Sequence, residues 1–313
     1  MKNEIFKIPI LFLIFNRPKY TNVVFNAIKN LQPKNLYVAA DGPRVNCQDD
    51  IFNCYVTRKI SLNINWDCNL RTLFRDHNLG CGRAISEAIT WFFNNVDYGI
   101  ILEDDCVPCD SFFFFCKELL EKYQFNKRIM HINGNNFNLP LKNLSKKDRS
   151  YSYHFGSFAQ VWGWASWKRA WENYDYTMRS WKDKKVRKKL RHKFPGIGSF
   201  LERSVSFDMV QNGKIDTWDY QWQYAVLVNN GLAIIPKYNL ITNIGYGNDS
   251  THIKAFNKNR NNLPTNNIEF PLKHSININI MKYLDHFYSR NMGMRLNLRH
   301  VHKYLLSYFR SVV

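Results

Sequence analysis

The chain has 313 residues, of which 45% are hydrophobic and 16% aromatic, and its formal net charge is +19. This apolar content can bury one large core or two modest ones, which excludes a chain that is disordered throughout. The positive charge indicates an anionic environment, such as polyphosphate, acidic membrane or nucleic acid, because Coulomb forces attract these partners over long distances. The sign of the charge does not choose among them.

The first apolar run, residues 8–15, predicts a buried strand. It is too short for a membrane span, and Asn-Arg-Pro follows it in place of a small-residue cleavage site, which argues against a signal peptide. The seven cysteines are odd in number and scattered, which favours reduced thiols and a cytoplasmic chain over a disulfide framework. Cys106 and Cys109 form a CxxC pair, but no second pair accompanies it for a zinc site.

The first hundred residues alternate short apolar runs with amphipathic segments, a pattern typical of a parallel sheet with helices on its faces. We expect strands over residues 8–15, 36–40, 70–75 and 98–102. Apolar residues at helical spacing predict helices near residues 24–31, 85–92 and 112–123, and a less regular helix is expected around residues 50–61. Asp110 precedes the last of these helices and is expected to cap it. The sequence therefore predicts an α/β fold.

Polar residues gather at the carboxyl ends of these strands. They are Asn16 and Arg17, Asp41 and Gly42, Asp76, and the acidic triplet Glu103, Asp104 and Asp105. In an open parallel sheet, ligands bind at this edge because loops and helix N-termini converge there. We therefore expect the functional site at this edge.

The acidic triplet itself suggests a metal. Three adjacent carboxylates raise one another's pKa values unless a cation or solvent screens them. Mg²⁺ or Mn²⁺ fits such a site, since these ions bind one or two carboxylates and fill their other positions with water and phosphate oxygens. The ion would also stabilise a departing nucleoside diphosphate. The alternative is a solvated strand end, with Asp105 as a turn residue.

Seven segments occur in order over residues 8–253: PILFLIFNRP, AADGP, RDHNLGCGRAI, YGIILEDDCVPCDSFFFFC, WGWASWKRAW, DTWDYQW and NIGYGNDSTH. Together they resemble bacterial GT-A glycosyltransferases related to the N-acetylglucosaminyltransferase I type. The resemblance implies a Rossmann-like catalytic domain over residues 1–280, mainly a parallel sheet with helices on both faces. Within it, residues 1–130 would bind the nucleotide sugar and residues 131–280 the acceptor. Residues 281–313 would form an amphipathic helical extension.

The resemblance also implies roles for the residues at the sheet edge. Asp105 would be the direct Mn²⁺ or Mg²⁺ ligand, and Asp104 would assist near the metal or the ribose. Arg17 and Asp41 match positions that hold the nucleotide base and ribose. The implied donor is a nucleoside diphosphate sugar, with a UDP-sugar favoured. The implied acceptor is a growing surface glycan, such as lipopolysaccharide or capsule, including a lipid-linked glycan.

Two further segments are candidates for the diphosphate. Asn78-x-Gly80-x-Gly82-Arg83 precedes a helix, so backbone amides, the helix dipole and Arg83 would suit an anion. The alternative is a simple helix-entry turn. His252 follows a Gly-rich stretch over residues 245–250 and would reach the metal or diphosphate from the C-terminal side. A lone histidine is, however, more often structural.

Asp219 is the candidate general base, because aromatic neighbours would partly desolvate it and let it take the proton of an acceptor hydroxyl. This implies single displacement with inversion. The alternative is that Asp216 or Asp219 only caps a helix. The rings of Trp162, Trp164 and Trp218 are candidates to support a sugar, with the first two in a predicted Gly-containing loop; aromatic core is the alternative.

The basic run over residues 182–193 and the apolar stripe over residues 301–312 predict a cationic, amphipathic face that rests peripherally on the anionic inner side of the cell membrane. The alternative is a solvated surface and an ordinary packed final helix. Co-sedimentation with liposomes, with and without residues 294–313, distinguishes the two. Equal partitioning would exclude the final helix as the anchor.

Two other functions fit parts of the pattern. A sugar-phosphate nucleotidyltransferase also uses metal and acidic strand ends, but usually has a longer Gly-rich loop with a basic residue after its first strand. This chain has Phe15-Asn16-Arg17-Pro18 there. A non-enzymatic nucleic-acid-binding protein would explain the charge and the aromatic residues. It leaves the acidic triplet unexplained, because carboxylates repel phosphate, so no nucleic-acid partner is expected.

Overall fold

The computed structural model of the chain describes residues 5–245 and 262–291. Its first half alternates strands and helices, as the sequence predicted. The elements are β1 (Ile10–Ile14), α1 (Pro18–Leu31), β2 (Asn35–Ala40), α2 (Gln48–Ser61), β3 (Asn69–Phe74), α3 (Gly80–Asn95), β4 (Tyr98–Glu103) and, further on, α4 (Asp110–Lys122). Each predicted strand and helix of this half is confirmed, with shifts of a few residues at the ends.

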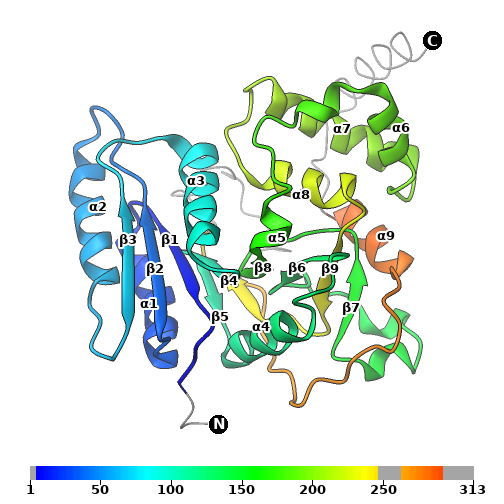
Figure 1. The fold of residues 1–313 in the computed structure, drawn as a ribbon, viewed down its shortest axis with the longest axis horizontal. Coiled ribbons are helices and arrows are strands. Elements are labelled where there is room, and N and C mark those ends of the chain that lie inside the picture. Colours follow the sequence, from blue (N-terminus) through cyan, green and yellow to red (C-terminus); the bar gives the residue numbers. More distant parts are fainter. Residues whose placement is uncertain (1–4, 246–261, 292–313) are drawn as a thin grey trace.

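Eight strands form one sheet in the order β3-β2-β1-β4-β8-β6-β9-β7 (Figure 1). The first four strands are parallel to one another. β8 (Trp164–Trp167) lies antiparallel between β4 and β6 (Ile129–Asn133), and β9 (Leu232–Pro236) and β7 (Tyr153–Gly156) complete the sheet. The predicted α/β class with a mainly parallel sheet is confirmed, and the arrangement is consistent with a GT-A, Rossmann-like fold.

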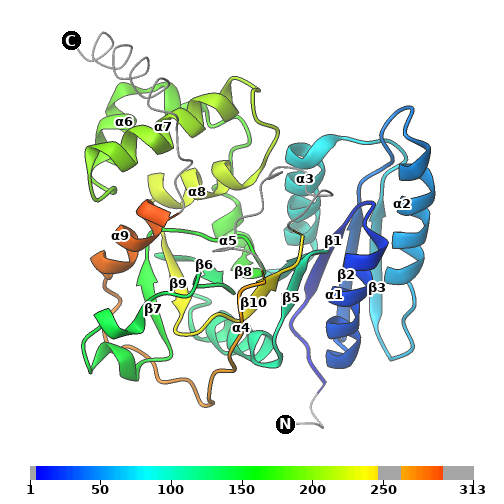
Figure 2. The ribbon, with the colours of Figure 1, turned by 180° about the vertical axis from the view of Figure 1, so that it is seen from behind.

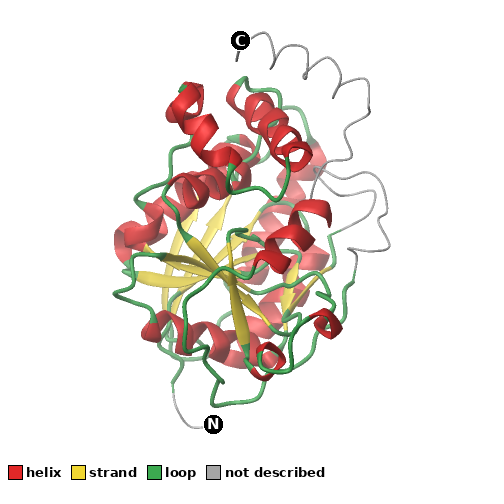
Figure 3. Ribbon diagram, turned by 90° about the vertical axis from the view of Figure 1, so that its right-hand side faces the viewer, coloured by secondary structure: helices red, strands yellow, loops and turns green. Residues whose placement is uncertain are grey.

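Helices cover both faces of the sheet (Figures 1, 2 and 3). All five residues of β1 are buried, and alternate ones face opposite cores because side chains on a strand have a period of two. Phe12 belongs to the core that contains α1 and α4, whereas Leu11 and Leu13 belong to the core beneath α3. The strand therefore reads as a continuous apolar run, as expected for a sheet buried on both faces.

The tryptophan-rich segment after residue 160 corrects one prediction. Trp162 and Trp164 were expected to lie in a Gly-containing loop, but Trp164 begins β8 and Trp171 ends α5 (Lys168–Trp171). These two rings pack with Trp218 and with Trp222 of α8 (Asp219–Val228) on the α3 side of the sheet. The aromatic side chains favour β-structure here because β8 lies between two other strands, where large rings are buried.

A helical lobe lies beyond α8 and carries the basic run. It contains α6 (Lys184–Arg191) and α7 (Ile197–Gln211). Their apolar side chains form a third hydrophobic core, separate from the two cores on the faces of the sheet, and α9 (Lys282–Asn291) packs into it. The basic run is thus a surface helix with its Leu190 buried. Within the residues that the structure describes, no helix is both long enough and apolar enough to cross a membrane. The apolar stripe over residues 301–312 lies outside the described residues, so membrane contact stays a prediction.

A short ribbon beside the main sheet pairs β5 (Cys106–Pro108) with β10 (Ile241–Asn243) in antiparallel fashion (Figure 2). It brings a late segment of the chain next to the acidic triplet. The helix that follows β5 begins at Asp110, with Cys109 at the N-cap position and no side-chain capping hydrogen bond. Asp110 was therefore wrongly predicted as the cap, although its carboxylate in the first turn still interacts favourably with the helix dipole.

Candidate active site

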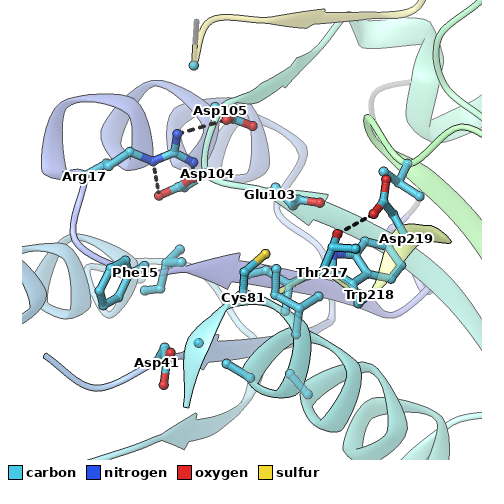
Figure 4. Close-up of a pocket in the computed structure, with 18 of the residues that line it drawn as sticks. Phe15, Arg17, Asp41, Cys81, Glu103, Asp104, Asp105, Thr217, Trp218 and Asp219 are labelled. Carbon is cyan, nitrogen blue, oxygen red and sulfur yellow. Dashed lines mark hydrogen bonds and ion pairs between the residues drawn. The ribbon is translucent and has the colours of Figure 1, made fainter. Parts of the chain in front are cut away.

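A cleft of about 1540 Å³ opens at the carboxyl ends of β1, β2 and β4. We call the side formed by these strand ends, with Arg17, Asp41 and residues 103–105, the donor wall, after the ligand that the sequence resemblance leads us to expect there. We call the side formed by residues 214–220, with Trp162, the acceptor wall, again after the expected ligand. Figure 4 shows Arg17, Asp104 and Asp105 on one side of this space and Asp219 on the other, with Glu103 between them.

Arg17 is the centre of the donor wall. Its guanidinium forms an ion pair with Asp104 through Nη2, and Nη1 lies 3.0 Å from Asp105 Oδ2. Burial alone would lower the pKa of Arg17, but the two aspartates raise it above its usual value. Because Arg17 follows β1 and the aspartates follow the adjacent strand β4, the parallel pairing of these strands produces the contact. The sequence prediction that these residues converge is confirmed.

The acidic triplet carries more negative charge than Arg17 neutralises. Burial raises the pKa of Asp104 to about 6, with Asp105 adding to the effect and Arg17 opposing it. Burial likewise raises the pKa of Glu103 well above its usual range, and both aspartates add to it. Oxygen donors with excess negative charge suit a divalent cation that completes its shell with water and phosphate. Within the described residues, no group of three or more acidic, histidine or cysteine side chains could hold a metal unaided.

Asp105 also contacts the ribbon strand β10. Its Oδ1 accepts a hydrogen bond of 3.3 Å from Asn243 Nδ2, and its backbone oxygen accepts one of 2.9 Å from Ile244. A Cβ atom at Gly245 would overlap the Asp105 carboxylate, so any larger residue here would displace the Asp105 side chain. Gly245 begins the Gly-rich stretch that precedes His252. His252 itself lies outside the described residues, and its contact with metal or diphosphate stays a prediction.

Asp41 lines the donor wall but is engaged by the protein. Oδ1 accepts hydrogen bonds from the backbone amides of Gly42 and Leu79 at 2.9 and 3.0 Å, and Oδ2 accepts one of 2.9 Å from Asn78 Nδ2. Burial raises its pKa, and the backbone hydrogen bonds oppose that rise. The carboxylate thus joins the end of β2 to the turn before α3, which fixes the floor of the cleft.

The N-terminus of α3 was predicted to bind a diphosphate, but a side chain from the acceptor wall lies there. Asp216 Oδ1 accepts a hydrogen bond of 3.0 Å from the amide of Gly82, across 134 residues of sequence. A Cβ at Gly80 would come within 2.5 Å of Asp216 Oδ2. Arg83 does not line the cleft; its side chain is 63% exposed and its Nη2 lies 3.3 Å from Glu87 Oε1. Arg83 is therefore not brought together with the donor wall.

Asp219 lies on the acceptor wall at the first residue of α8. The Thr217 hydroxyl donates a hydrogen bond to Oδ1 of Asp219, as the dashed line in Figure 4 marks. The alternative that Asp216 or Asp219 caps this helix does not fit, because α8 has no side-chain capping hydrogen bond and Asp216 bonds to α3 instead. The carboxylate of Asp219 therefore faces the cleft.

The three candidate tryptophans occupy different environments. Trp162 lines the cleft and is partly exposed, with its ring centroid 4.8 Å from that of Phe137. Trp218 is almost fully buried but still reaches the cleft surface. Trp164 has no exposed surface and stacks on His131 and Trp218, with centroid distances of 5.0 and 5.7 Å. Trp164 is therefore core, and it does not line the cleft.

The structure adds residues that sequence reasoning did not assign to the site. Asp50, which is only 1% exposed, accepts hydrogen bonds of 2.6 Å from both Asn16 Nδ2 and Arg44 Nε. Hydrogen bonding from Arg44 holds the pKa of Asp50 well below its usual range. Cys81 also lines the cleft, and burial raises its pKa, with Glu103 adding to the effect. The sequence gives no local signal for these contacts, since each joins separate elements.

No family model matches the sequence, and no curated protein matches it. Among solved structures, the galactosyltransferase LgtC in complex with donor and acceptor sugar analogs is 12% identical over 70% of each chain, with a TM-score of 0.34. An active-site mutant of LgtC is 10% identical over 70% of each chain, with a TM-score of 0.36. HddC from Yersinia pseudotuberculosis is 11% identical over 53% of this chain and 80% of its own, with a TM-score of 0.31. Likeness this distant transfers no activity, and the resemblance to the N-acetylglucosaminyltransferase I type stays a prediction.

Proposed function

We propose that this chain is a glycosyltransferase, which moves a sugar from a nucleoside diphosphate sugar to a hydroxyl group of a glycan with the help of Mn²⁺ or Mg²⁺. The observation that carries the proposal is that two separate sets of charged side chains face each other across one cleft. Arg17, Asp104 and Asp105 form the donor wall, and Asp219 faces them from the acceptor wall. This arrangement provides for cation-assisted binding of a diphosphate and for proton removal at a separate point.

On the donor wall, Asp105 and Asp104 would hold the divalent cation together with the donor's diphosphate. The bound ion would supply positive charge that stabilises the nucleoside diphosphate as it leaves. Arg17, which already bridges both aspartates, keeps these carboxylates in place and would contact the nucleotide. Asp41 supports the floor on which the base and ribose would lie, through its bonds to the turn before α3.

On the acceptor wall, Asp219 would remove the proton of the attacking hydroxyl. The oxygen of that hydroxyl forms the new bond to the anomeric carbon, while the bond from this carbon to the phosphate oxygen breaks and its electrons leave with the nucleoside diphosphate. Thr217 donates to Oδ1 of Asp219, so we assign Oδ2 to the acceptor. One displacement from the face opposite the leaving group inverts the anomeric configuration. Trp162 and Trp218 would support the sugar rings.

Hydrolysis and thermal-shift screening of nucleotide sugars tests the reaction class. The screen is run with Mn²⁺ or Mg²⁺ and repeated with a chelator. We expect at least one sugar nucleotide, a UDP-sugar first, to be hydrolysed slowly and to raise the melting temperature only when metal is present. No response to any nucleotide sugar would overturn the proposal. The acceptor, which we propose to be a growing surface glycan, is then sought with the identified donor.

Asp219→Asn tests the proposed base separately from donor binding. It should lower the transfer rate by about 10²- to 10⁴-fold, because the amide does not accept the proton, while the donor Kd stays unchanged. Asp97→Asn is the matched control, since Asp97 is an exposed aspartate that does not line the cleft. Substantial residual transfer by Asp219→Asn, or an equal loss in both variants, would remove Asp219 from this role.

A further inference from the structure

A cationic subsite, which we define as Arg203, Lys214 and Tyr220, forms part of the cleft beside the proposed base. Arg203 belongs to α7 and is partly buried, and its guanidinium carbon lies 5.2 Å from the centroid of the Tyr220 ring. Lys214 is exposed and stands in the connection between α7 and α8. Tyr220 directly follows Asp219 in the chain, and both line the same cleft as Arg203 and Lys214, so the subsite and the proposed base belong to one wall.

Arg203 differs from the other partly buried arginines in the described part of the chain. The others each donate to a carboxylate or carbonyl oxygen; they are Arg17, Arg58, Arg75, Arg169 and Arg187. Among the described residues, Arg203 donates no such hydrogen bond and forms no ion pair; its guanidinium lies over the Tyr220 ring. Within the described part of the chain, the guanidinium is therefore partly withdrawn from water without an ion pair, and its electrostatic interaction with the neighbouring Glu202 carboxylate forms no salt bridge.

The packing of α7 explains why Arg203 faces inward. Phe200 and Phe207 stand three residues before it and four residues after it, on the same helical face, and both are buried in the third core. That shared face directs Arg203 toward the protein and the cleft. The cation–π contact with Tyr220 then holds the guanidinium near this ring.

A partly desolvated guanidinium gains most from an anion with two oxygens in one plane. Arginine presents paired N–H donors in a fixed geometry that matches carboxylate and phosphate, and such charge-assisted bonds are stronger than neutral ones. Neutral sugar hydroxyls would not replace the lost hydration as well. The nearby Lys214 adds a second positive charge on the same wall. The chemistry of this subsite therefore selects negatively charged ligands.

We propose that the acceptor wall recognises an acidic acceptor, a glycan with a carboxylate or phosphate group that binds at Arg203 and thereby brings a neighbouring hydroxyl to Asp219. This inference rests on the proposed function, because it names the substrate class of the same cleft. Carboxylate and phosphate share the chemistry that Arg203 recognises. A uronic acid and a sugar phosphate are the two sources that the experiment separates.

Calorimetric titration with three small probes tests the subsite without knowledge of the natural acceptor. Glucuronic acid and glucose 6-phosphate are compared with glucose on the full chain. We expect at least one acidic probe to bind about 10-fold or more tightly than glucose, as one charge-assisted pair implies. Arg203→Gln should bring this ratio close to one, and Arg203→Lys should keep part of it. The exposed Arg191 of α6, changed to Gln, is the matched control and should keep the full ratio.

The ratio of the glucose Kd to the Kd of an acidic probe, measured within each variant, distinguishes a loss of recognition from a loss of folding. A general loss of structure would weaken the binding of all three probes together and leave this ratio unchanged. Equal binding of acidic and neutral probes by the unaltered chain overturns the proposal, as does an unchanged ratio in Arg203→Gln. Tighter binding of glucuronic acid indicates a uronic acid, and tighter binding of glucose 6-phosphate a phosphorylated acceptor. Failure of nucleotide-sugar hydrolysis alongside an Arg203-dependent ratio would refute the proposed function and leave the anion subsite standing.

Discussion

Two adjoining regions of the molecule treat polar groups in opposite ways. The donor wall gathers three carboxylates around the single guanidinium of Arg17, so it keeps unbalanced negative charge. The aromatic layer, made of Trp164, Trp171, Trp218 and Trp222 around His131, buries neutral groups instead. There, His131 Nε2 lies 2.8 Å from the Gln160 carbonyl, and its Nδ1 accepts from Trp222 Nε1 at 3.0 Å.

The two regions therefore have different roles: the donor wall provides charge for ligand binding, and the aromatic layer stabilises the fold around the cleft. Unbalanced buried charge lowers the stability of the free protein. A cation or substrate that binds in the cleft would neutralise part of this charge, and the relieved repulsion would add to the binding free energy. The aromatic layer contributes apolar burial and holds α8 against β8 beneath the acceptor wall. Substitutions in the aromatic layer should therefore change mainly the free energy of unfolding. Those at the cleft surface should change mainly binding and rate.

Trp164 and Trp162 offer the sharpest test, because they are two residues apart. Trp164→Ala should lower the free energy of unfolding by about 3–5 kcal/mol, since it removes a fully buried ring that stacks on both sides. Trp162→Ala should lower it by less than about 1 kcal/mol and raise the acceptor KM. Urea unfolding and acceptor kinetics measure the two effects. Equal destabilisation by both substitutions would break the distinction between layer and cleft.

The aromatic layer should also lose stability in acid. Burial lowers the pKa of His131 to about 4, while the hydrogen bond with Gln160 opposes that shift. Because an unfolded histidine titrates near 6.5, the unfolded state binds more protons between these values, so stability falls as pH drops from about 6.5 to 4. The loss attributable to His131 approaches about 3 kcal/mol at the lower end.

Urea unfolding at pH 7 and pH 5 measures this dependence. In His131→Gln, the fall in unfolding free energy between the two pH values should be smaller than in the unaltered chain by about 2 kcal/mol. His154, whose pKa burial also lowers to about 4, continues to contribute in both proteins. A pH dependence identical in the two proteins would show that His131 is not kept neutral by its surroundings.

The smallest effect is expected at Arg83, which tests where the cleft ends. Arg83→Ala should change the donor KM by less than about 2-fold, because the side chain is exposed and pairs with Glu87 along α3. Its loss should cost at most about 0.5 kcal/mol of stability. Donor kinetics beside thermal melting provide the measurement. A rise of 10-fold in donor KM would restore the diphosphate contact that the sequence suggested and would extend the donor wall to this arginine.

Local patterns in the sequence were enough for the first half of the fold. Apolar patterns marked the strands β1 to β4 and the helices α1 to α4, although not the short strand β5, and the polar residues after β1, β2 and β4 marked the edge where the cleft opens. Parallel strands place their carboxyl ends together, so the contact of Arg17 with Asp104 and Asp105 followed from element order. These features depend on short windows of sequence and on one general rule of sheet geometry.

Other features were decided by the tertiary structure alone. Trp162 and Trp164 look alike in sequence, but the insertion of β8 between β4 and β6 buries one and leaves the other at the cleft. Asp216 meets Gly82 only because the acceptor wall folds back against the N-terminus of α3, and Arg203 reaches Tyr220 only because α7 packs against α8. Burial and charge partners are set by segments far apart in the chain, so periodicity within one segment does not determine them.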